Sequence, residues 1–473
     1  MSYIYVKDGV SKSAIIEFLK REKEIAKTEI HAFSVIRKGE LLCRVALDPY
    51  EIYDNKQLFS LSKSFCSTAV GFAVDEGLFK VTDRIIDIFP EDCPAVIDEK
   101  LSKMTVHNVL SMSTGHASCV MGLMIKADNP VKAFLAKELA YNPGEKFVYN
   151  TGATLLLSII VQKYTGKTVY DYLYEKLFRY LDHTPEKWDM ISSGYSEGGV
   201  GLYAEIRDIE NLGKLYLGNG KIGDRRFLSE EWVAAASSKQ IDNSGNGTPD
   251  WCSGYGYQFW RNSKDGFRGD GAFGQLCFML PSTETIVSVQ CESEDMQLEV
   301  DEVYKLSDSI EGEDNISIEE LTDFISKFYA PKEASVGDFA GFGKSYKLSD
   351  NGIGLKYIDF SNNCGDISIK LTGNGRTQYI DVAAGEYIIN SLTLPSFKPT
   401  LTGLIPDRNE ECVFASCITE CTEDTLSVFY RFKNAPHSGK IIFTEANGEL
   451  SITFIPGTGS MREFSKIISG TEI

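Results

Sequence analysis

The start of the chain carries a helical pattern, then two strand-like patterns, then a second helix. Apolar side chains recur at helical spacing over residues 11–29, with lysines and glutamates between them, which predicts an amphipathic helix. Two strands are expected next, near residues 31–37 and 41–46, joined by a turn at Lys38-Gly39-Glu40. Residues 60–76 then carry apolar side chains on most sides of a helix, which predicts that this helix is buried.

The middle of the chain changes from helical to strand-like patterns. Residues 81–215 are expected to be mostly helical, with breaks at prolines and glycine pairs. Strands are expected near residues 255–260, 273–280 and 285–291. A helix over residues 296–309 would pack back on these strands. The first part of the chain is therefore predicted to mix helices with strands.

A polar, turn-rich stretch divides the chain into two parts. It covers residues 311–315 and favours a linker, and a short helix over residues 317–329 follows it. Beyond that helix the sequence is strand after strand, and Asn447-Gly448 is a typical hairpin turn. We therefore predict two domains, residues 1–330 and residues 335–473, the second being an antiparallel β meander or barrel.

Composition restricts the partners of this chain. The formal net charge is −19, from 48 Lys and Arg against 67 Asp and Glu. A surface this acidic repels phosphate backbones and anionic lipids, so nucleic acid and membrane partners are not expected. The N-terminus lacks a basic segment followed by an apolar one, so we expect no secretory signal. Eleven scattered cysteines, an odd number, favour reduced thiols and a cytoplasmic location.

One short motif offers nucleophilic chemistry. Ser60 and Lys63 form a Ser-x-x-Lys sequence at the start of the buried helix, where a spacing of three residues places both side chains on one face. A serine hydroxyl becomes a good nucleophile when a neighbouring base accepts its proton, and a desolvated lysine with a lowered pKa is such a base. Alone, the motif is better explained by a helix-capping serine followed by a solvated lysine.

Two later segments supply partners for this pair. Tyr149 follows a turn at Pro143-Gly144 and stands at the expected start of a helix, where it could accept and return protons. Residues 268–275 form a glycine-rich stretch beside a strand, and glycines there let a substrate lie close to the backbone. A packing tyrosine and a plain hairpin are the alternative interpretations.

Five segments, in this order, resemble the motifs of the β-lactamase-related serine hydrolases. That group includes class C β-lactamases, low-molecular-weight penicillin-binding proteins and serine esterases, and the resemblance covers roughly residues 10–310. An ordered set of motifs is far more specific than any one of them. The segments are Ser60 to Phe65, Met104 to His116, Pro143 to Gly152, Gly198 to Tyr203, and Gly271 to Gln275.

The resemblance implies a role for each matching residue. Ser60 matches the nucleophile that accepts the acyl group, Lys63 the motif lysine, and Tyr149 the motif tyrosine. The backbone N–H groups of Ser60 and Ala272 match the oxyanion hole. Five further residues are expected to bind substrate: Asn150, Thr151, Gly269, Asp270 and Gly271.

This chain departs from the family pattern at two places. Thr151 replaces the asparagine of the tyrosine motif, although Asn150 is adjacent. Gly269 stands where the family has a cation that attracts a substrate carboxylate. Strand alternation turns Arg268 to the other face, and Asp270 is expected to repel such a carboxylate.

The resemblance implies an α+β fold: an antiparallel sheet packed by the terminal helices, with a helical insertion near residues 75–200. It implies a serine hydrolase that needs no metal or cofactor and acts through an acyl-enzyme on a small ester or amide. A β-lactamase or D-alanyl-peptide hydrolase, and a binding protein without turnover, are the alternatives. The pattern leaves the substrate, the oligomeric state and the role of the β domain open.

A second serine motif is a poorer candidate. Residues 194–198 match the Gly-x-Ser-x-Gly pattern, with Ser196 at its centre. That pattern requires a buried strand before it and a histidine later in the same domain. The residues before it are not strand-like, and the only later histidine, His437, falls in the other predicted domain.

Overall fold

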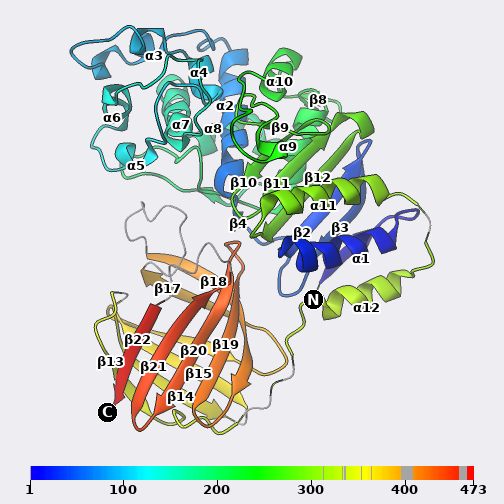
Figure 1. Ribbon diagram of the computed structural model, residues 1–473, viewed down its shortest axis with the longest axis vertical. Coiled ribbons are helices and arrows are strands. Elements are labelled where there is room, and N and C mark those ends of the chain that lie inside the picture. Colours follow the sequence, from blue (N-terminus) through cyan, green and yellow to red (C-terminus); the bar gives the residue numbers. More distant parts are fainter. Residues whose placement is uncertain are drawn as a thin grey trace.

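The computed structural model describes residues 2–312, 314–332, 334, 337–352, 354–363, 365–395, 409–457 and 466–473. These residues form two parts, which lie one above the other in Figure 1. The first part is a sheet packed by helices, and the second is a closed antiparallel sheet. Separate hydrophobic cores fill the two parts.

The first part is built on a seven-stranded antiparallel sheet. Its strand order is β1-β3-β2-β12-β11-β10-β9, so strands from the start of the chain lie beside strands from the end of this part. The strands are β1 (Tyr3–Val6), β2 (Glu29–Arg37), β3 (Glu40–Ala46), β9 (Trp260–Arg261), β10 (Phe267–Gly271), β11 (Gln275–Leu280) and β12 (Thr285–Glu292).

The predicted strands are partly confirmed. The hairpin between β2 and β3 turns at Lys38 and Gly39, which have φ of 52° and 78°, the left-handed pair that tight hairpins require. The strand expected at 255–260 is wrong, because only β9 forms at its end. The strand expected at 273–280 is confirmed as β11, apart from Phe273 and Gly274, which belong to the turn that joins it to β10.

Helices cover both faces of this sheet, as Figure 1 shows. One face packs against α1 (Lys12–Arg21), α11 (Met296–Ser309) and α12 (Ile318–Phe328), and the other against α9 (Ile206–Leu217). The first predicted helix is shorter than residues 11–29, because it becomes a π-helical turn, Glu22–Ala26, and then stops at Lys27 with φ of 55°.

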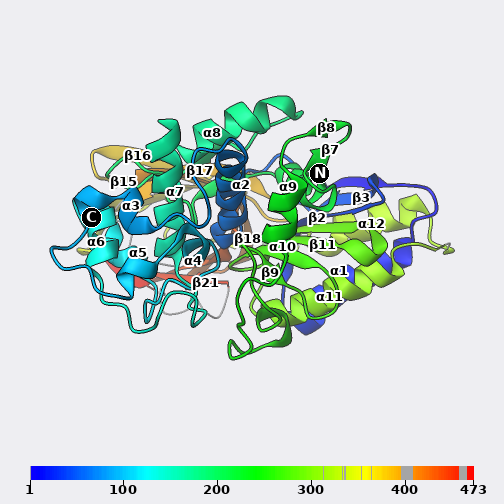
Figure 2. The same ribbon diagram turned by 90° about the horizontal axis from the view of Figure 1, so that it is seen from above.

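Helix α2 (Ser62–Asp75) separates the sheet from a helical region, as Figure 2 shows from above. Its predicted burial is confirmed, since the helix is buried from Ser62 to Ala73. The helical insertion is also confirmed. Its helices are α3 (Ile85–Ile88), α4 (Val106–Leu110), α5 (Met121–Met124), α6 (Pro130–Ala136), α7 (Thr151–Thr165) and α8 (Val169–Lys176); α10 (Glu230–Ser237) lies beyond it.

Short strands and turns complete the first part. A three-stranded sheet lies beside the start of α2, and a separate short hairpin lies between α9 and α10. Together with the long sheet they form the α+β fold that the resemblance implies. The strands are β4 (Lys56–Gln57), β5 (Lys187–Trp188), β6 (Leu202–Ala204), β7 (Lys221–Ile222) and β8 (Arg225–Arg226).

The second part is a ten-stranded antiparallel barrel. Its order is β16-β15-β14-β13-β22-β21-β20-β19-β18-β17, and side-chain amides join the two end strands. Asn390 Oδ1 accepts from the Asp381 N–H at 2.8 Å, and Gln378 Oε1 accepts from the Thr393 N–H at 2.6 Å. Of the two predicted forms, meander or barrel, the barrel is therefore the one that forms.

The barrel strands are as follows: β13 (Ser345–Leu348), β14 (Leu355–Asn363), β15 (Asp366–Gly373), β16 (Arg376–Val382), β17 (Ile388–Pro395), β18 (Asn409–Cys421), β19 (Thr425–Phe432), β20 (Ser438–Ala446), β21 (Glu449–Pro456) and β22 (Lys466–Glu472).

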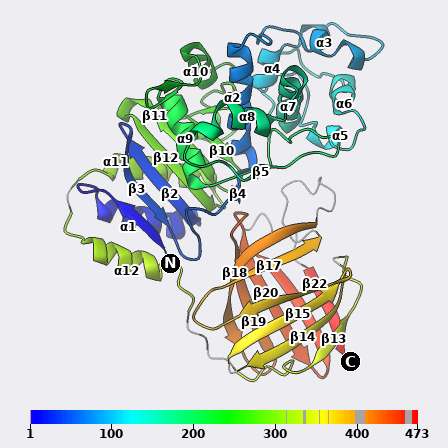
Figure 3. The same ribbon diagram turned by 180° about the vertical axis from the view of Figure 1, so that it is seen from behind.

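Polar contacts fix the barrel to the first part. Arg431 on β19 donates to both carboxylate oxygens of Glu29 on β2, at 2.6 and 2.9 Å. Tyr387 donates to the Tyr329 carbonyl at 2.9 Å. In Figures 1 and 3 the end of the barrel that includes β18 lies next to β4. Because buried charges are costly unless they are paired, the Arg431–Glu29 pair favours one fixed arrangement of the two parts.

The expected linker lies between α11 and α12, which both belong to the first part. Asp314 accepts from the Ser13 N–H at 2.6 Å, and Glu311 bridges to Val10. The expected linker at residues 311–315 therefore starts against the beginning of α1. The helix expected at 317–329 is confirmed as α12, which Ser317 caps with its side chain.

Candidate active site

The predicted nucleophile lies on a short 3-10 turn, Phe59–Leu61, directly before α2. Backbone bonds to β6 hold this turn: the Leu58 N–H donates to the Leu202 carbonyl at 2.8 Å, and the Leu202 N–H donates to Ser62 Oγ at 3.2 Å. Ser60 itself is partly exposed, while its neighbours on both sides are buried. The fold therefore presents one serine hydroxyl from a fixed backbone.

Ser60 and Lys63 are in direct contact. The Lys63 Nζ lies 2.9 Å from Ser60 Oγ and donates to the Gly199 carbonyl at 2.8 Å. Only 1% of Lys63 is exposed, and burial lowers its pKa to about 7. A lysine with this pKa is largely a neutral amine at slightly alkaline pH, so its lone pair can accept the Ser60 proton while an N–H still binds Gly199.

Tyr149 lies beside the same pair. Its ring centroid is 4.8 Å from Lys63 Nζ, and the ring stacks on Trp260 at 5.4 Å. Tyr149 could readily accept a proton only if Lys63 and its surroundings lowered its pKa, and they do not. Burial raises that pKa well above its usual value, Asp270 raises it further, and hydrogen bonding with Ser60 offsets only a part of the rise. Tyr149 is thus a neutral phenol, suited to donate a proton.

Asn150 supports the Tyr149 turn from inside the protein. Its Oδ1 accepts from the Gly152 N–H and from the Val120 N–H, each at 3.0 Å, so it caps α7 and fixes a neighbouring loop. The side chain is fully buried. Its Oδ1 therefore has a capping role, while its Nδ2 has no hydrogen-bond partner among the described residues, and the expected contact with substrate stays a prediction. Thr151, the other expected substrate residue, packs its methyl group against Gly199.

Gly269 and Gly271 allow β10 to lie against the nucleophile segment. A Cβ on Gly271 would be 2.1 Å from the Leu58 carbonyl oxygen, and one on Gly269 would be 2.5 Å from Leu61 Cδ1. Both distances are shorter than any real contact, so neither position accepts a side chain without movement. The two glycines therefore let the backbone of β10 come close to Ser60, as expected for residues near the site.

Asp270 and Arg268 share the opposite face of β10 and pair with each other. Asp270 Oδ2 accepts from Arg268 Nε at 3.1 Å, and the Arg268 guanidinium also contacts Asn262 and lies 4.3 Å over the ring of Trp251. Arg268 is fully buried and Asp270 is nearly so. The expectation that Asp270 repels a substrate carboxylate therefore loses its basis, because Arg268 compensates its charge.

Ala272 begins the turn between β10 and β11. Phe273 and Gly274 take left-handed φ of 63° and 85°, which closes the hairpin over three residues. Among the described residues, no backbone carbonyl accepts from the Ala272 N–H. Gly271, directly before it, is packed on the Ser60 turn. The geometry is consistent with an oxyanion hole formed by the N–H groups of Ser60 and Ala272.

Several residues near the site were missed in the sequence. The Gly199 carbonyl belongs to a motif that was recognised, but its bond to Lys63 depends on a long-range contact. An aromatic wall of Phe147, Tyr255 and Trp260 surrounds Tyr149, with ring centroids 4.9 to 5.5 Å apart. Cys119 is an exposed free thiol. The one feature of the sequence that could have indicated these residues is the cluster of aromatic side chains at residues 251–260.

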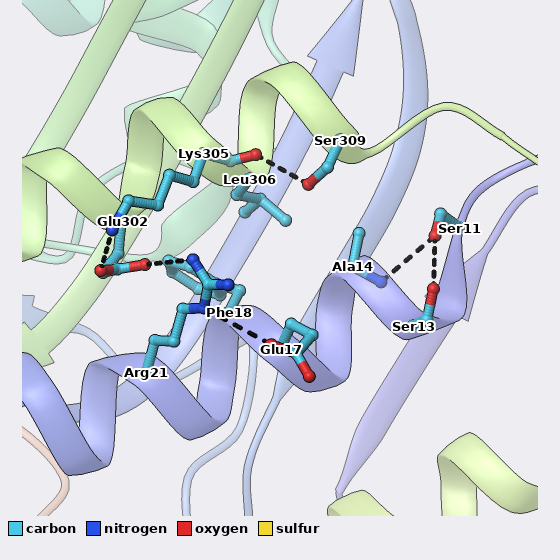
Figure 4. Close-up of a pocket in the computed structure, with 10 residues that line it drawn as sticks. All are labelled: Ser11, Ser13, Ala14, Glu17, Phe18, Arg21, Glu302, Lys305, Leu306 and Ser309. Atoms are coloured by element: carbon cyan, nitrogen blue, oxygen red, sulfur yellow. Dashed lines mark hydrogen bonds and ion pairs between the residues drawn. The ribbon is translucent and has the colours of Figure 1, made fainter.

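The other candidate sites lack this chemistry. Ser196 is buried, and no helix follows it, so the Gly-x-Ser-x-Gly interpretation is not supported. Figure 4 shows a cavity of about 290 Å³ between α1 and α11, in which Arg21 and Lys305 contact the carboxylate of Glu302. The serines that line it are engaged otherwise than Ser60: Ser11 Oγ donates to the Asp314 carboxylate at 3.2 Å, and Ser309 Oγ donates to the Lys305 carbonyl at 2.7 Å.

Metal sites and membrane spans are not found in the described ranges. Nowhere in them do three or more His, Cys, Asp or Glu side chains group closely enough to hold a metal ion. None of the helices there combines the length and apolar character that crossing a membrane requires.

Several known proteins are similar to this chain in sequence or in structure. A 6-aminohexanoate-dimer hydrolase of Paenarthrobacter ureafaciens is 26% identical over 290 residues, which cover 56% of this chain and 73% of that protein. A penicillin-binding protein homologue from Caulobacter crescentus is similar in structure, with 16% identity, a TM-score of 0.53, and coverage of 65% of this chain and 100% of that one. EstCE1, a hydrolase with promiscuous acyltransferase activity, matches with 13% identity, a TM-score of 0.50, and coverage of 63% and 98%.

The family described as Beta-lactamase matches residues 56–306, more than half of the chain. This segment includes Ser60, Lys63 and Tyr149, and it ends within α11. The resemblance found in the sequence is thereby confirmed, and so is the predicted fold. The chain belongs to the β-lactamase family and is a serine hydrolase.

Proposed function

We propose that this hydrolase acts on small neutral esters or amides through an acyl-enzyme on Ser60. The observation that carries the proposal is the 2.9 Å contact between Ser60 Oγ and the buried Lys63, whose pKa is about 7. A nucleophile with an activated base beside it is the arrangement that acyl transfer requires. We also propose a cytoplasmic location, which the free thiol at every described cysteine supports.

Each residue has one role in the proposed reaction. Neutral Lys63 accepts the Ser60 proton while Oγ attacks the substrate carbonyl, and the N–H groups of Ser60 and Ala272 hold the oxyanion that forms. Tyr149 donates a proton to the departing alcohol or amine and regains one from the Lys63 ammonium. Water then attacks the acyl-enzyme, and the same groups move its proton in the reverse direction.

The charges near Ser60 support a neutral substrate. Gly269 and Gly271 provide no cation, and the Arg268 guanidinium is already engaged with Asp270, Asn262 and Trp251. A substrate carboxylate next to β10 would lose water without gaining a counter-charge, which is costly. The aromatic wall around Tyr149 instead suits a short apolar acyl or alcohol group. The relative from Paenarthrobacter is named for hydrolysis of a 6-aminohexanoate dimer, which is an amide and also carries a carboxylate, so this relative supports amide substrates but not their neutrality.

The proposal is tested by trapping the acyl-enzyme. The protein is incubated with short p-nitrophenyl esters, with benzylpenicillin and with a D-alanyl-D-alanine peptide, then quenched and analysed by peptide mass spectrometry. We expect an acyl group on the peptide that contains Ser60, and kcat/KM higher for the esters. Ser60→Ala should abolish both signals, while Ser196→Ala should change neither. Acylation only at another serine would refute the nucleophile, and preference for the carboxylate-bearing compounds would restore the β-lactamase or peptidase function.

The lowered pKa of Lys63 sets the pH dependence. Below a pH of about 7 this lysine is protonated and cannot accept the Ser60 proton, so kcat/KM for a neutral ester should fall about tenfold per pH unit. Above that pH the amine is neutral, and kcat/KM should reach a plateau. A pH–rate profile with a substrate that does not titrate measures this directly. An inflection near the ordinary pKa of lysine, about 10.4, would show that burial does not tune Lys63.

A further inference from the structure

The barrel contacts the segment that leads to Ser60. The connection between β19 and β20, residues 433–437, runs along β4: the Gln57 N–H donates to the Asn434 carbonyl at 3.3 Å, and Lys56 Nζ donates to the Lys433 carbonyl at 3.0 Å. Lys56 is fully buried there. Ser60 follows Gln57 by three residues, so the barrel holds the backbone from which the nucleophile projects.

His437, the last residue of that connection, reaches the site more closely. Its ring centroid lies 4.6 Å from the ring of Phe273 and 6.0 Å from that of Phe59, edge to face in both cases. Only 2% of His437 is exposed. Nδ1 is 3.7 Å from a carboxylate oxygen of Glu292, whose other oxygen accepts from Ser438 Oγ at 2.6 Å. Glu292 on β12, which Ser438 on β20 fixes by a hydrogen bond, therefore lies against the His437 ring.

The two phenylalanines are the immediate neighbours of the oxyanion donors. Phe59 precedes Ser60, and Phe273 follows Ala272. Both have left-handed φ, 46° and 63°, a conformation that bulky residues avoid unless surrounding contacts impose it. The two rings also pack on each other at 5.4 Å. His437 thus completes a three-ring cluster that fixes the backbone on both sides of the expected oxyanion hole.

We propose that His437 is a positioning residue, through which the barrel holds the Ser60 and Ala272 N–H groups at the separation that an oxyanion needs. The inference rests on the proposed function, because it takes those two N–H groups as the oxyanion hole. It gives the barrel a role in catalysis, although all the side chains expected to react come from the first part of the chain. Loss of the ring would let Phe59 and Phe273 relax and would separate the two donors.

The test uses the full-length protein with His437→Ala, His437→Leu and His437→Phe. We measure kcat and KM with a p-nitrophenyl ester, and the second-order rate at which a fluorophosphonate labels Ser60. The alanine and leucine variants should lose about 10- to 100-fold in kcat and in labelling rate, since misplacement of a donor by about 1 Å has this scale of effect. KM should stay within about twofold. His437→Phe restores a planar ring and should recover most of both rates.

Tyr387→Phe is the matched control, because it removes a hydrogen bond between the two parts without touching Phe59 or Phe273. It should keep both rates near those of the wild type. Normal kcat and labelling in a folded His437→Leu protein would overturn the inference, as would an equal loss in Tyr387→Phe. Failure of the wild type to label at Ser60 would instead overturn the proposed function, so the two failures are distinguishable.

Discussion

Replacement of Lys63 by methionine is expected to lower kcat for ester hydrolysis by about 10²–10⁴-fold, the usual contribution of a general base. Methionine nearly preserves the volume of the buried lysine but cannot accept a proton from Ser60. Labelling of Ser60 by a fluorophosphonate should slow by a similar factor, because it uses the same activated oxygen. Circular dichroism and thermal unfolding would show whether the variant remains folded.

Removing a buried amine should not harm the fold. Lys63 loses its hydration on folding, and its charged form is destabilised there, which offsets the cost of leaving the Gly199 carbonyl without its donor. Lys132→Met, on the exposed surface, is the control for a general loss of charge. Tyr149→Phe should also lower kcat strongly, and the double variant should lose little more, since the two residues act on one proton path. Full activity in Lys63→Met would remove the lysine from the mechanism.

A local pattern was sufficient to predict the contact between Ser60 and Lys63, while their roles as nucleophile and base came from the ordered set of motifs and stay a prediction. The two residues are three apart along a 3-10 turn that leads directly into α2, so their contact follows from helical geometry. Tyr149 could be placed only through the order of motifs, since its approach to Lys63 depends on the packing of α7 against α2. The raised pKa of Tyr149 was not predictable, because burial depends on the aromatic residues at 255–260 that close over it.

Strand β10 shows where sequence patterns fail. Its sequence, Phe267 to Gly271, has two glycines and an aspartate, residues that disfavour strands, so the pattern suggested an irregular entry to a later strand. The two glycines instead allow this strand to lie close against the nucleophile turn. Alternation along the strand correctly turned Arg268 away from the face of Gly269. It also implied that Arg268 and Asp270 share a face, but their ion pair was overlooked.

The contribution of the barrel could not have been predicted. Residues 433–437 and residues 56–60 are far apart in the sequence, and nothing in either segment indicates the other. The backbone strain at Phe59 and Phe273 is equally invisible, since most phenylalanines have ordinary backbone angles. The polar stretch at residues 311–315 and the strand-like patterns after it predict that residues 1–330 and 335–473 are separate domains, and this stays a prediction.

Replacement of Gly271 by alanine is expected to reduce kcat by about 10²–10³-fold, which is about 2.7–4 kcal/mol and the effect of losing one oxyanion donor. The added Cβ would lie 2.1 Å from the Leu58 carbonyl oxygen and 3.1 Å from the Leu61 nitrogen, both of them backbone atoms. A backbone atom cannot rotate away, so β10 must move from the nucleophile turn. The Ala272 N–H would move with it, away from Ser60.

Gly269→Ala is the matched control two residues away on the same strand. Its Cβ would meet Leu61 Cδ1 at 2.5 Å and Ser64 Oγ at 2.6 Å, which are ends of side chains that can turn aside. Its loss in kcat should therefore stay within about tenfold, a range typical of small positional changes. KM should change little in either variant, because the donors act on charge that develops after binding. Equal kcat in both variants, with Ser60 labelled at the wild-type rate, would show that the close approach of β10 serves packing alone.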